Sequence, residues 1–138
     1  VIGTVAAIVP ALLAQGHGTI GIVSSVAGYG GLPKALVYGA SKAALINFAE
    51  TLYLDLAPRG LGVALINPGF VRTPLTDRNA FPMPYLISAD EAAAEIVAGL
   101  ERGDFEIHFP RAFSRRLKLL RLLPYRWYFA IVRKATGV

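Results

Sequence analysis

The chain has 138 residues, of which 54% are apolar and 17% are charged, and it contains no cysteine. This length allows one compact domain and argues against two, and the apolar share excludes a disordered chain. The lack of cysteine excludes disulfides, thiolate metal ligands and cysteine nucleophiles. With His17 and His108 as the only histidines, we expect no metal site.

Charge divides the chain into two parts. Residues 1–106 carry 6 basic and 9 acidic side chains, whereas residues 107–138 carry 8 basic side chains and no acidic one. The net charge of +5 therefore describes a basic tail on a mildly acidic body.

The residues before Lys34 include no Asp, Glu, Lys or Arg. Their apolar run ends at Ala14, short of the ~20 residues that a membrane span needs, and no basic segment precedes it as in a signal peptide. A buried helix explains this run better. Because the sequence opens in mid-pattern without Met, we expect it to be a piece of a longer protein.

The hydropathy pattern predicts alternating helices and strands. Three segments with helical spacing and end signals are predicted to be helices: 1–15, 35–56 and 89–100. Three short apolar or β-branched runs are predicted to be strands: 19–24, 62–66 and 105–109. The first helix is expected to be buried on most sides, its following strand to be fully buried, and the third helix to be capped by Ser88 or Asp90.

This alternation predicts the α/β class, with a parallel sheet built from βαβ units. In such sheets ligands bind beyond the carboxyl ends of the strands, where the loops 25–33 and 67–77 are expected to lie. The tail, 111–138, is predicted to form basic amphipathic helices that Pro124 divides in two.

The first candidate for chemistry is the pair Tyr38 and Lys42, which share a helix face because they lie four residues apart. An ammonium beside a phenol favours the phenolate, so Tyr38 could act as a general acid or base. Taken alone, such a pair is more often a surface tyrosine with a solvated lysine. At the same sheet edge, Ser25 could donate a hydrogen bond to a substrate carbonyl, although strand alternation does not decide whether Ser24 or Ser25 faces the cleft.

Three motifs, in this order and spacing, resemble the short-chain dehydrogenase/reductase family: Val23-Ser24-Ser25-Val-Ala-Gly28, Tyr38-Gly-Ala-Ser41-Lys42-Ala-Ala and Asn67-Pro-Gly-Phe-Val-Arg-Thr73. The resemblance covers residues 1–110. It implies the C-terminal part of a Rossmann-like, doubly wound parallel sheet, to which 111–138 adds a helical extension. It also implies an oxidoreductase that transfers hydride between NADP or NAD and a carbonyl/alcohol substrate.

The resemblance assigns roles to individual residues. Ser25 would polarise the substrate, Tyr38 would donate or accept the proton, and Lys42 would stabilise the phenolate and hold the nicotinamide ribose. The implied cofactor-binding residues are Tyr38, Lys42, Pro68, Gly69, Val71 and Thr73. The family's glycine-rich turn, its cofactor-selecting residue and its catalytic Asn are not in this sequence, so we expect the segment alone to be inactive.

The family builds dimer interfaces from helices like 1–15 and 35–56, which implies a cytoplasmic homodimer or homotetramer. A catalytically silent Rossmann-like binding or scaffold protein is the alternative, and the intact set of Ser25, Tyr38 and Lys42 disfavours it. A nucleic-acid-binding tail is disfavoured because its aromatic residues cluster with leucines.

Two further segments bear on the substrate and on the cellular location. The segment 78–87 is apolar, with Phe81, Met83 and Tyr85, which favours a hydrophobic or lipid-like carbonyl substrate, although a lid has the same composition.

In the tail, Leu117, Leu120 and Leu123 share one helix face beside a row of basic residues. This pattern predicts either packing on the body or peripheral contact of 111–134 with an anionic membrane. Pro124 and the basic residues exclude a transmembrane span.

Overall fold

Strand β2 (Gly62–Pro68) is the central strand of a three-stranded sheet in the computed structural model, which describes residues 1–74, 76 and 83–137. It pairs in parallel with β1 (Thr19–Val23) on one side and with β3 (Glu106–Phe109) on the other. Because all three strands run the same way, their carboxyl ends meet at one edge of the sheet, and the loops that follow them start there.

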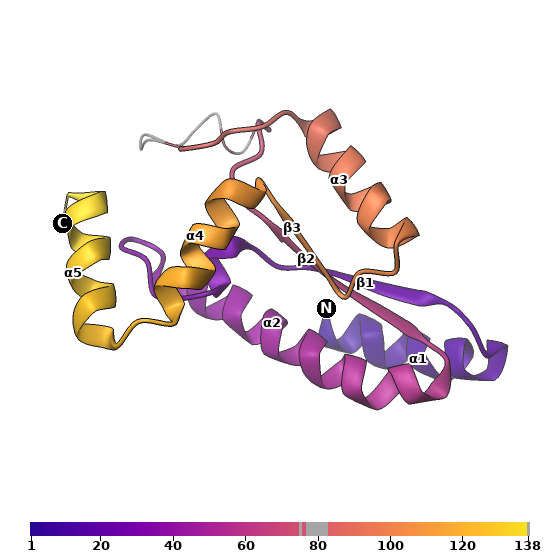
Figure 1. The fold of residues 1–138 in the computed structure, drawn as a ribbon. Helices are drawn as coiled ribbons and strands as arrows, with labels where there is room; N and C mark the ends of the chain where they lie inside the picture. The colour runs from indigo at the N-terminus through magenta and orange to yellow at the C-terminus, as the bar shows by residue number, and fades with distance from the viewer. Residues whose placement is uncertain (75, 77–82, 138) are drawn as a thin grey trace.

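Helices cover both faces of the sheet (Figure 1). Helices α1 (Ile2–Gln15) and α2 (Leu36–Leu56) lie on one face, and α3 (Ala89–Glu101) lies on the other. This arrangement confirms the predicted fold class, a partial Rossmann-like, doubly wound parallel sheet.

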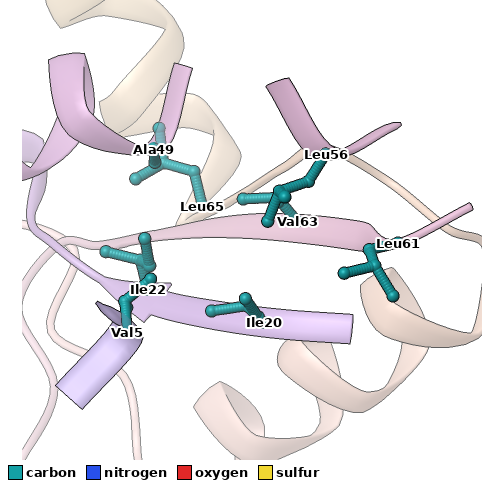
Figure 2. Packing of buried hydrophobic residues seen from close by; sticks show 8 residues of the cluster. All are labelled: Val5, Ile20, Ile22, Ala49, Leu56, Leu61, Val63 and Leu65. Carbon is teal, nitrogen blue, oxygen red and sulfur yellow. The ribbon is translucent and has the colours of Figure 1, made fainter. Parts of the chain in front are cut away.

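The alternation of side chains along β2 builds two cores. Val63 and Leu65 point to the face of α1 and α2, where they pack with Ile20, Ile22 and Ala49 (Figure 2). The intervening residues of β2 pack on the other face, in a cluster made of Ala64, Ile66, Ala92, Ile107 and Phe109. A strand that is buried on both faces reads as a continuous apolar run, which is why this strand is evident from the sequence.

Two burial predictions are wrong. In α1 only Val5 is buried, and in β1 burial alternates, so that Ile20 and Ile22 are buried while Val23 is 54% exposed. Helix α3 packs against β2 and β3, and Thr19, Gly21 and Val23, which lie on the same face of the sheet in β1, are exposed. Apolar sequence predicted these elements correctly, but their burial depends on what lies opposite them.

The element ends follow local signals. Helix α2 is followed by a 3-10 turn, η2 (Ala57–Arg59), and by Gly60 with φ +81°, a left-handed conformation that favours glycine. Of the two predicted caps of α3, Ser88 is the one observed. Its hydroxyl accepts from the Glu91 backbone N–H, and the Glu91 carboxylate accepts from the Ser88 backbone N–H. Strand β2 extends two residues further than predicted and ends at Pro68.

The tail forms two helices, α4 (Arg111–Arg121) and α5 (Tyr125–Thr136), with Pro124 at the start of the second as predicted. Both lie toward the carboxyl end of the sheet (Figure 1). Of the predicted leucine row, Leu117 and Leu120 are half-buried and Leu123 is exposed. Leu119 and Leu122, which lie outside the row, are also exposed. No helix of the described residues is both long and apolar enough to cross a membrane.

Candidate active site

Two adjacent serines follow β1, and the structure gives them different partners. The Ser24 hydroxyl donates to the backbone oxygen of Lys42 at 2.8 Å, which ties the end of β1 to α2. The Ser25 hydroxyl accepts from the Ala27 backbone N–H at 3.2 Å, because Ser25 caps the short 3-10 helix η1 (Val26–Gly28). It also donates to the Pro68 oxygen at 3.4 Å, a long and therefore weak bond.

Tyr38 and Lys42 lie on successive turns of α2, close to its N-terminal end. The Lys42 Nζ atom is 5.6 Å from the centre of the Tyr38 ring and donates to the Val23 oxygen at 3.3 Å. The Tyr38 side chain is 54% exposed, and its hydroxyl makes no hydrogen bond to any residue that the structure describes. The two side chains of the predicted pair therefore lie close together, with the lysine bound to the end of β1 and the tyrosine exposed.

Two glycines allow the serine loop to approach α2 closely. A Cβ atom on Gly28 would lie 2.8 Å from the carbonyl carbon of Lys42, and one on Gly39 would lie 3.3 Å from the Ala27 oxygen. The first contact is too short for any side chain. Glycine at position 28 is therefore required for η1 to pack against the turn of α2 that carries Lys42.

The turn after β2 brings Pro68 and Gly69 to the same edge. The Gly69 N–H donates to the Phe109 oxygen at 2.7 Å, and a Cβ on Gly69 would lie 3.1 Å from Pro110, so this turn packs tightly on the start of the tail. Beyond it, Val71 forms an isolated parallel bridge with Ile87.

The predicted residues Val71 and Thr73 are linked to each other through Thr76. The Thr76 hydroxyl donates to the Val71 oxygen at 2.8 Å, and it lies 3.2 Å from the Thr73 hydroxyl. Within the described residues, no hydrogen bond joins Val71 or Thr73 to Tyr38 or Lys42. The structure therefore directly links Ser25 with Pro68, and Tyr38 with Lys42. The predicted substrate segment 78–87 lies partly outside the described residues, which resume at Met83.

Sequence reasoning missed a cluster around Glu106. One carboxylate oxygen of Glu106 accepts from the Tyr29 hydroxyl at 2.6 Å and from the Asn67 side-chain nitrogen at 2.9 Å. The other oxygen is paired with the Lys118 ammonium of α4. A carboxylate at the start of a short strand and a tyrosine inside a glycine-rich loop were the available signals.

Burial and hydrogen bonding set the charge states of this cluster. Burial alone would raise the pKa of the Glu106 carboxyl, but hydrogen bonds from Lys118, Tyr29 and Asn67 outweigh it and lower the pKa. Burial, and then the hydrogen bond to Glu106 and its negative charge, raise the pKa of Tyr29. Glu106 is therefore a carboxylate and Tyr29 a neutral donor.

The parallel sheet, the helices on both its faces and the loops at its carboxyl edge define an α/β protein of the Rossmann-like class. Residues 1–81 match the family model described as short chain dehydrogenase. The chain belongs to the short-chain dehydrogenase family.

Relatives and solved structures extend this likeness into the tail. A Myxococcus xanthus (strain DK1622) protein named an uncharacterized oxidoreductase is 37% identical over 131 residues, which is 95% of this chain and 52% of that protein. An Arabidopsis thaliana protein named 11-beta-hydroxysteroid dehydrogenase-like 4A is 37% identical over 98 residues, 66% of this chain and 32% of that protein. The chain thus spans about half, or less, of the length of these relatives.

Among solved structures, a short-chain dehydrogenase from Burkholderia cenocepacia J2315 in complex with NADP is similar with a TM-score of 0.81 and 29% identity. The match covers 95% of this chain and 53% of that one. A short-chain dehydrogenase from Sphingobium yanoikuyae in complex with NADPH has a TM-score of 0.70 and 25% identity, over 86% of this chain and 51% of that one.

Proposed function

We propose that the full-length protein is an oxidoreductase that transfers hydride between a nicotinamide cofactor and a carbonyl/alcohol substrate. The observation that carries this proposal is the pair of Tyr38 and Lys42 on successive turns of α2, beside the Ser25 loop, in a chain of the short-chain dehydrogenase family. Because the chain spans only part of its relatives, the segment alone is proposed to be inactive.

The residues present fit a nicotinamide dinucleotide. Lys42 uses one of its three N–H donors on the Val23 oxygen, so the others are available to ribose hydroxyls. The Pro68–Gly69 turn, Val71 and Thr73 are proposed to contact the nicotinamide carboxamide. The complexes of similar proteins with NADP and with NADPH support a cofactor of this kind, and the proposal leaves both NADP and NAD open.

A bound nicotinamide dinucleotide supplies the hydride in reduction and accepts it in oxidation. In reduction, Tyr38 gives its hydroxyl proton to the carbonyl oxygen of the substrate, and the nearby Lys42 ammonium stabilises the phenolate that remains. Ser25 holds the same oxygen by donating a hydrogen bond to it. Its present bond to Pro68, at 3.4 Å, is weak enough to be exchanged for that role.

The proposed substrate is hydrophobic or lipid-like. Its support is a group of stacked aromatic rings at the carboxyl end of the sheet, where the Phe113 ring stacks on Phe70 at 5.9 Å and on Tyr85 at 5.8 Å between ring centres. Tyr85 is exposed at this point.

We further propose a cytoplasmic enzyme whose tail contacts an anionic membrane. The exposed side chains of Leu119, Leu122 and Trp127 lie among the basic residues of a segment that has no acidic residue after Glu106. Such a surface combines apolar insertion with attraction to the negative cytoplasmic leaflet. A homodimer or homotetramer is proposed through α1 and α2, which expose Ile2, Ile8 and Leu54.

The test uses the full-length protein and follows the absorbance of NADPH or NADH during reduction of a panel of hydrophobic ketones and aldehydes. Tyr38→Phe is expected to lower turnover by at least ~10²-fold, the usual size of a lost general acid or base, with cofactor binding retained. Lys42→Ala is expected to weaken both turnover and cofactor binding. Near-normal turnover in Tyr38→Phe would overturn the proposal. Cofactor binding without turnover of any member of the panel by the wild type would favour the silent Rossmann-like binding protein.

A further inference from the structure

Glu106 connects the loop after β1 with the end of β2, and the Ser25 hydroxyl lies between these two segments. Tyr29, in the loop after β1, and Asn67, at the end of β2, both donate to the same oxygen of Glu106, at 2.6 and 2.9 Å. Asn67 directly precedes Pro68, whose oxygen accepts from Ser25. Each of the two segments that form the Ser25–Pro68 contact therefore contains a residue that donates a hydrogen bond to Glu106.

The hydrogen bonds of this cluster are formed by buried or partly buried groups, which limits the motion of the side chains. Asn67 is fully buried, and the Glu106 side chain is only 23% exposed, so its hydrogen bonds are shielded from water and strengthened. Lys118 pairs with the second oxygen of Glu106 and lies 5.5 Å from the centre of the Tyr29 ring. Both oxygens of the carboxylate are therefore bound, and their three partners come from three different segments of the chain.

The tail reaches the same loop at a second point. The hydroxyl of Tyr128, a buried residue of α5, donates to the Gly31 oxygen at 2.9 Å. A Cβ on Gly30 would lie 2.7 Å from that hydroxyl, so the loop and α5 are in direct contact. Helices α4 and α5 therefore both contact the segment that carries Ser25.

We propose that Glu106 is a positioning residue, which together with Lys118 and Tyr128 of the tail fixes the Ser25 loop against the Asn67–Gly69 turn. The proposal rests on the proposed function, because it gives a catalytic purpose to the placement of Ser25. Glu106 makes no hydrogen bond to Ser25, Tyr38 or Lys42 and acts through Tyr29 and Asn67. A misplacement of about 1 Å in a reacting group can cost roughly 10²-fold in rate. The hydrogen bonds of Glu106 therefore affect turnover through the position of Ser25.

The test compares three variants of the full-length protein. Tyr29→Phe removes one hydrogen bond to Glu106 and keeps the ring beside Lys118, and Glu106→Ala removes every acceptor. Glu106→Gln restores an acceptor oxygen for Tyr29 and Asn67 without the charge. The matched control is Asp104→Asn, which breaks the exposed 2.7 Å ion pair with Arg102, also close to β3 but away from the loop.

The measurements are kcat and KM with the fastest ketone of the panel, NADPH affinity by fluorescence, and amide hydrogen exchange of residues 25–33. We expect Tyr29→Phe and Glu106→Ala to lower kcat by about tenfold or more, within the range for a displaced group. NADPH affinity should change little, and exchange of the Gly28 and Tyr29 amides should become faster. Glu106→Gln should recover a large part of kcat, and Asp104→Asn should match the wild type.

A merely structural role would lower the melting temperature without separating kcat from NADPH affinity. If Tyr29→Phe is folded and keeps both wild-type kcat and wild-type exchange, the inference is wrong, and this holds even where Glu106→Ala does not fold. Tyr38→Phe in the same assay separates the two proposals. Activity retained in Tyr38→Phe overturns the proposed function, whereas activity lost there but kept in Tyr29→Phe overturns only the role of Glu106.

Discussion

Ser24 and Ser25 are neighbours with the same side chain, yet the structure gives them separate tasks. Ser24 makes a short hydrogen bond to α2, and Ser25 makes a long one to the turn after β2. We expect Ser24→Ala to lower the free energy of unfolding by about 1 kcal/mol, the usual net value of one such bond, with a small effect on turnover. Denaturant unfolding of the full-length protein measures this.

Ser25→Ala should have the opposite profile. Loss of one hydrogen-bond donor to a developing negative charge costs about 10²–10³-fold in kcat, while the weak bond to Pro68 contributes little to stability. The two alanine variants therefore serve as controls for each other. Equal losses of turnover in both variants would contradict this division of roles between the two serines.

The lowered pKa of Glu106 makes a pH-dependent contribution to stability. A carboxyl whose pKa is lower in the folded than in the unfolded state stabilises the fold above its unfolded pKa of about 4.3. This contribution is lost as the pH falls through the folded pKa. The difference in unfolding free energy between wild type and Glu106→Gln should therefore be constant near neutrality and shrink below about pH 4. A difference that grows in acid would contradict the assignment.

At the scale of elements, Gly99 decides how α3 lies on the sheet. A Cβ there would be 2.6 Å from the Ile107 side chain of β3. Helix propensity alone predicts that Gly99→Ala gains about 1 kcal/mol, whereas forcing α3 away from β3 costs about 1–3 kcal/mol. We expect net destabilisation of the full-length protein by thermal or denaturant unfolding. A gain in stability would mean that α3 shifts freely.

The elements were predictable where their signals are local. The helix predicted over 35–56 begins at Leu36 and ends at Leu56, because its apolar spacing and the following Pro58 and Gly60 are adjacent in sequence. The burial of α1 and β1 was not predictable, because it depends on which elements pack opposite them.

The candidate site also contains one part that local sequence predicts and one part that depends on residues far apart in the chain. Tyr38 and Lys42 lie four residues apart, so their approach follows from helix geometry. The hydrogen bond of Tyr29 to Glu106 spans 77 residues, and that of Asn67 to Glu106 spans 39. No local pattern specifies such pairs, because the sheet has to form before these side chains meet.

At the scale of the whole molecule, the tail both packs on the body and exposes apolar side chains. Leu122 is 80% exposed and Trp127 is 60% exposed, and each directly follows an exposed arginine in the sequence. We expect the full-length protein to float with vesicles of phosphatidylserine and phosphatidylcholine at low salt and to dissociate at high salt. Pure phosphatidylcholine vesicles, which are neutral, should bind it poorly.

Point variants separate the two parts of this membrane prediction while keeping Tyr128 on the Gly31 loop. Leu122→Ser with Trp127→Ser should weaken binding at every salt concentration. Arg115→Gln with Arg126→Gln should weaken it at low salt, by about 1 kcal/mol or roughly fivefold for each charge. Absence of wild-type binding to the anionic vesicles at low salt would refute the membrane contact.

The bond between Tyr128 and Gly31 also has a consequence for synthesis, because it joins residues 97 positions apart. At a translation rate of about 5–20 residues per second, the ribosome adds Tyr128 roughly 5–20 s after Gly31. Glu106 and Lys118 are added late in this interval, and Tyr128 is added at its end. The nascent chain therefore contains the Ser25 loop before it contains the residues that we propose to hold this loop in place.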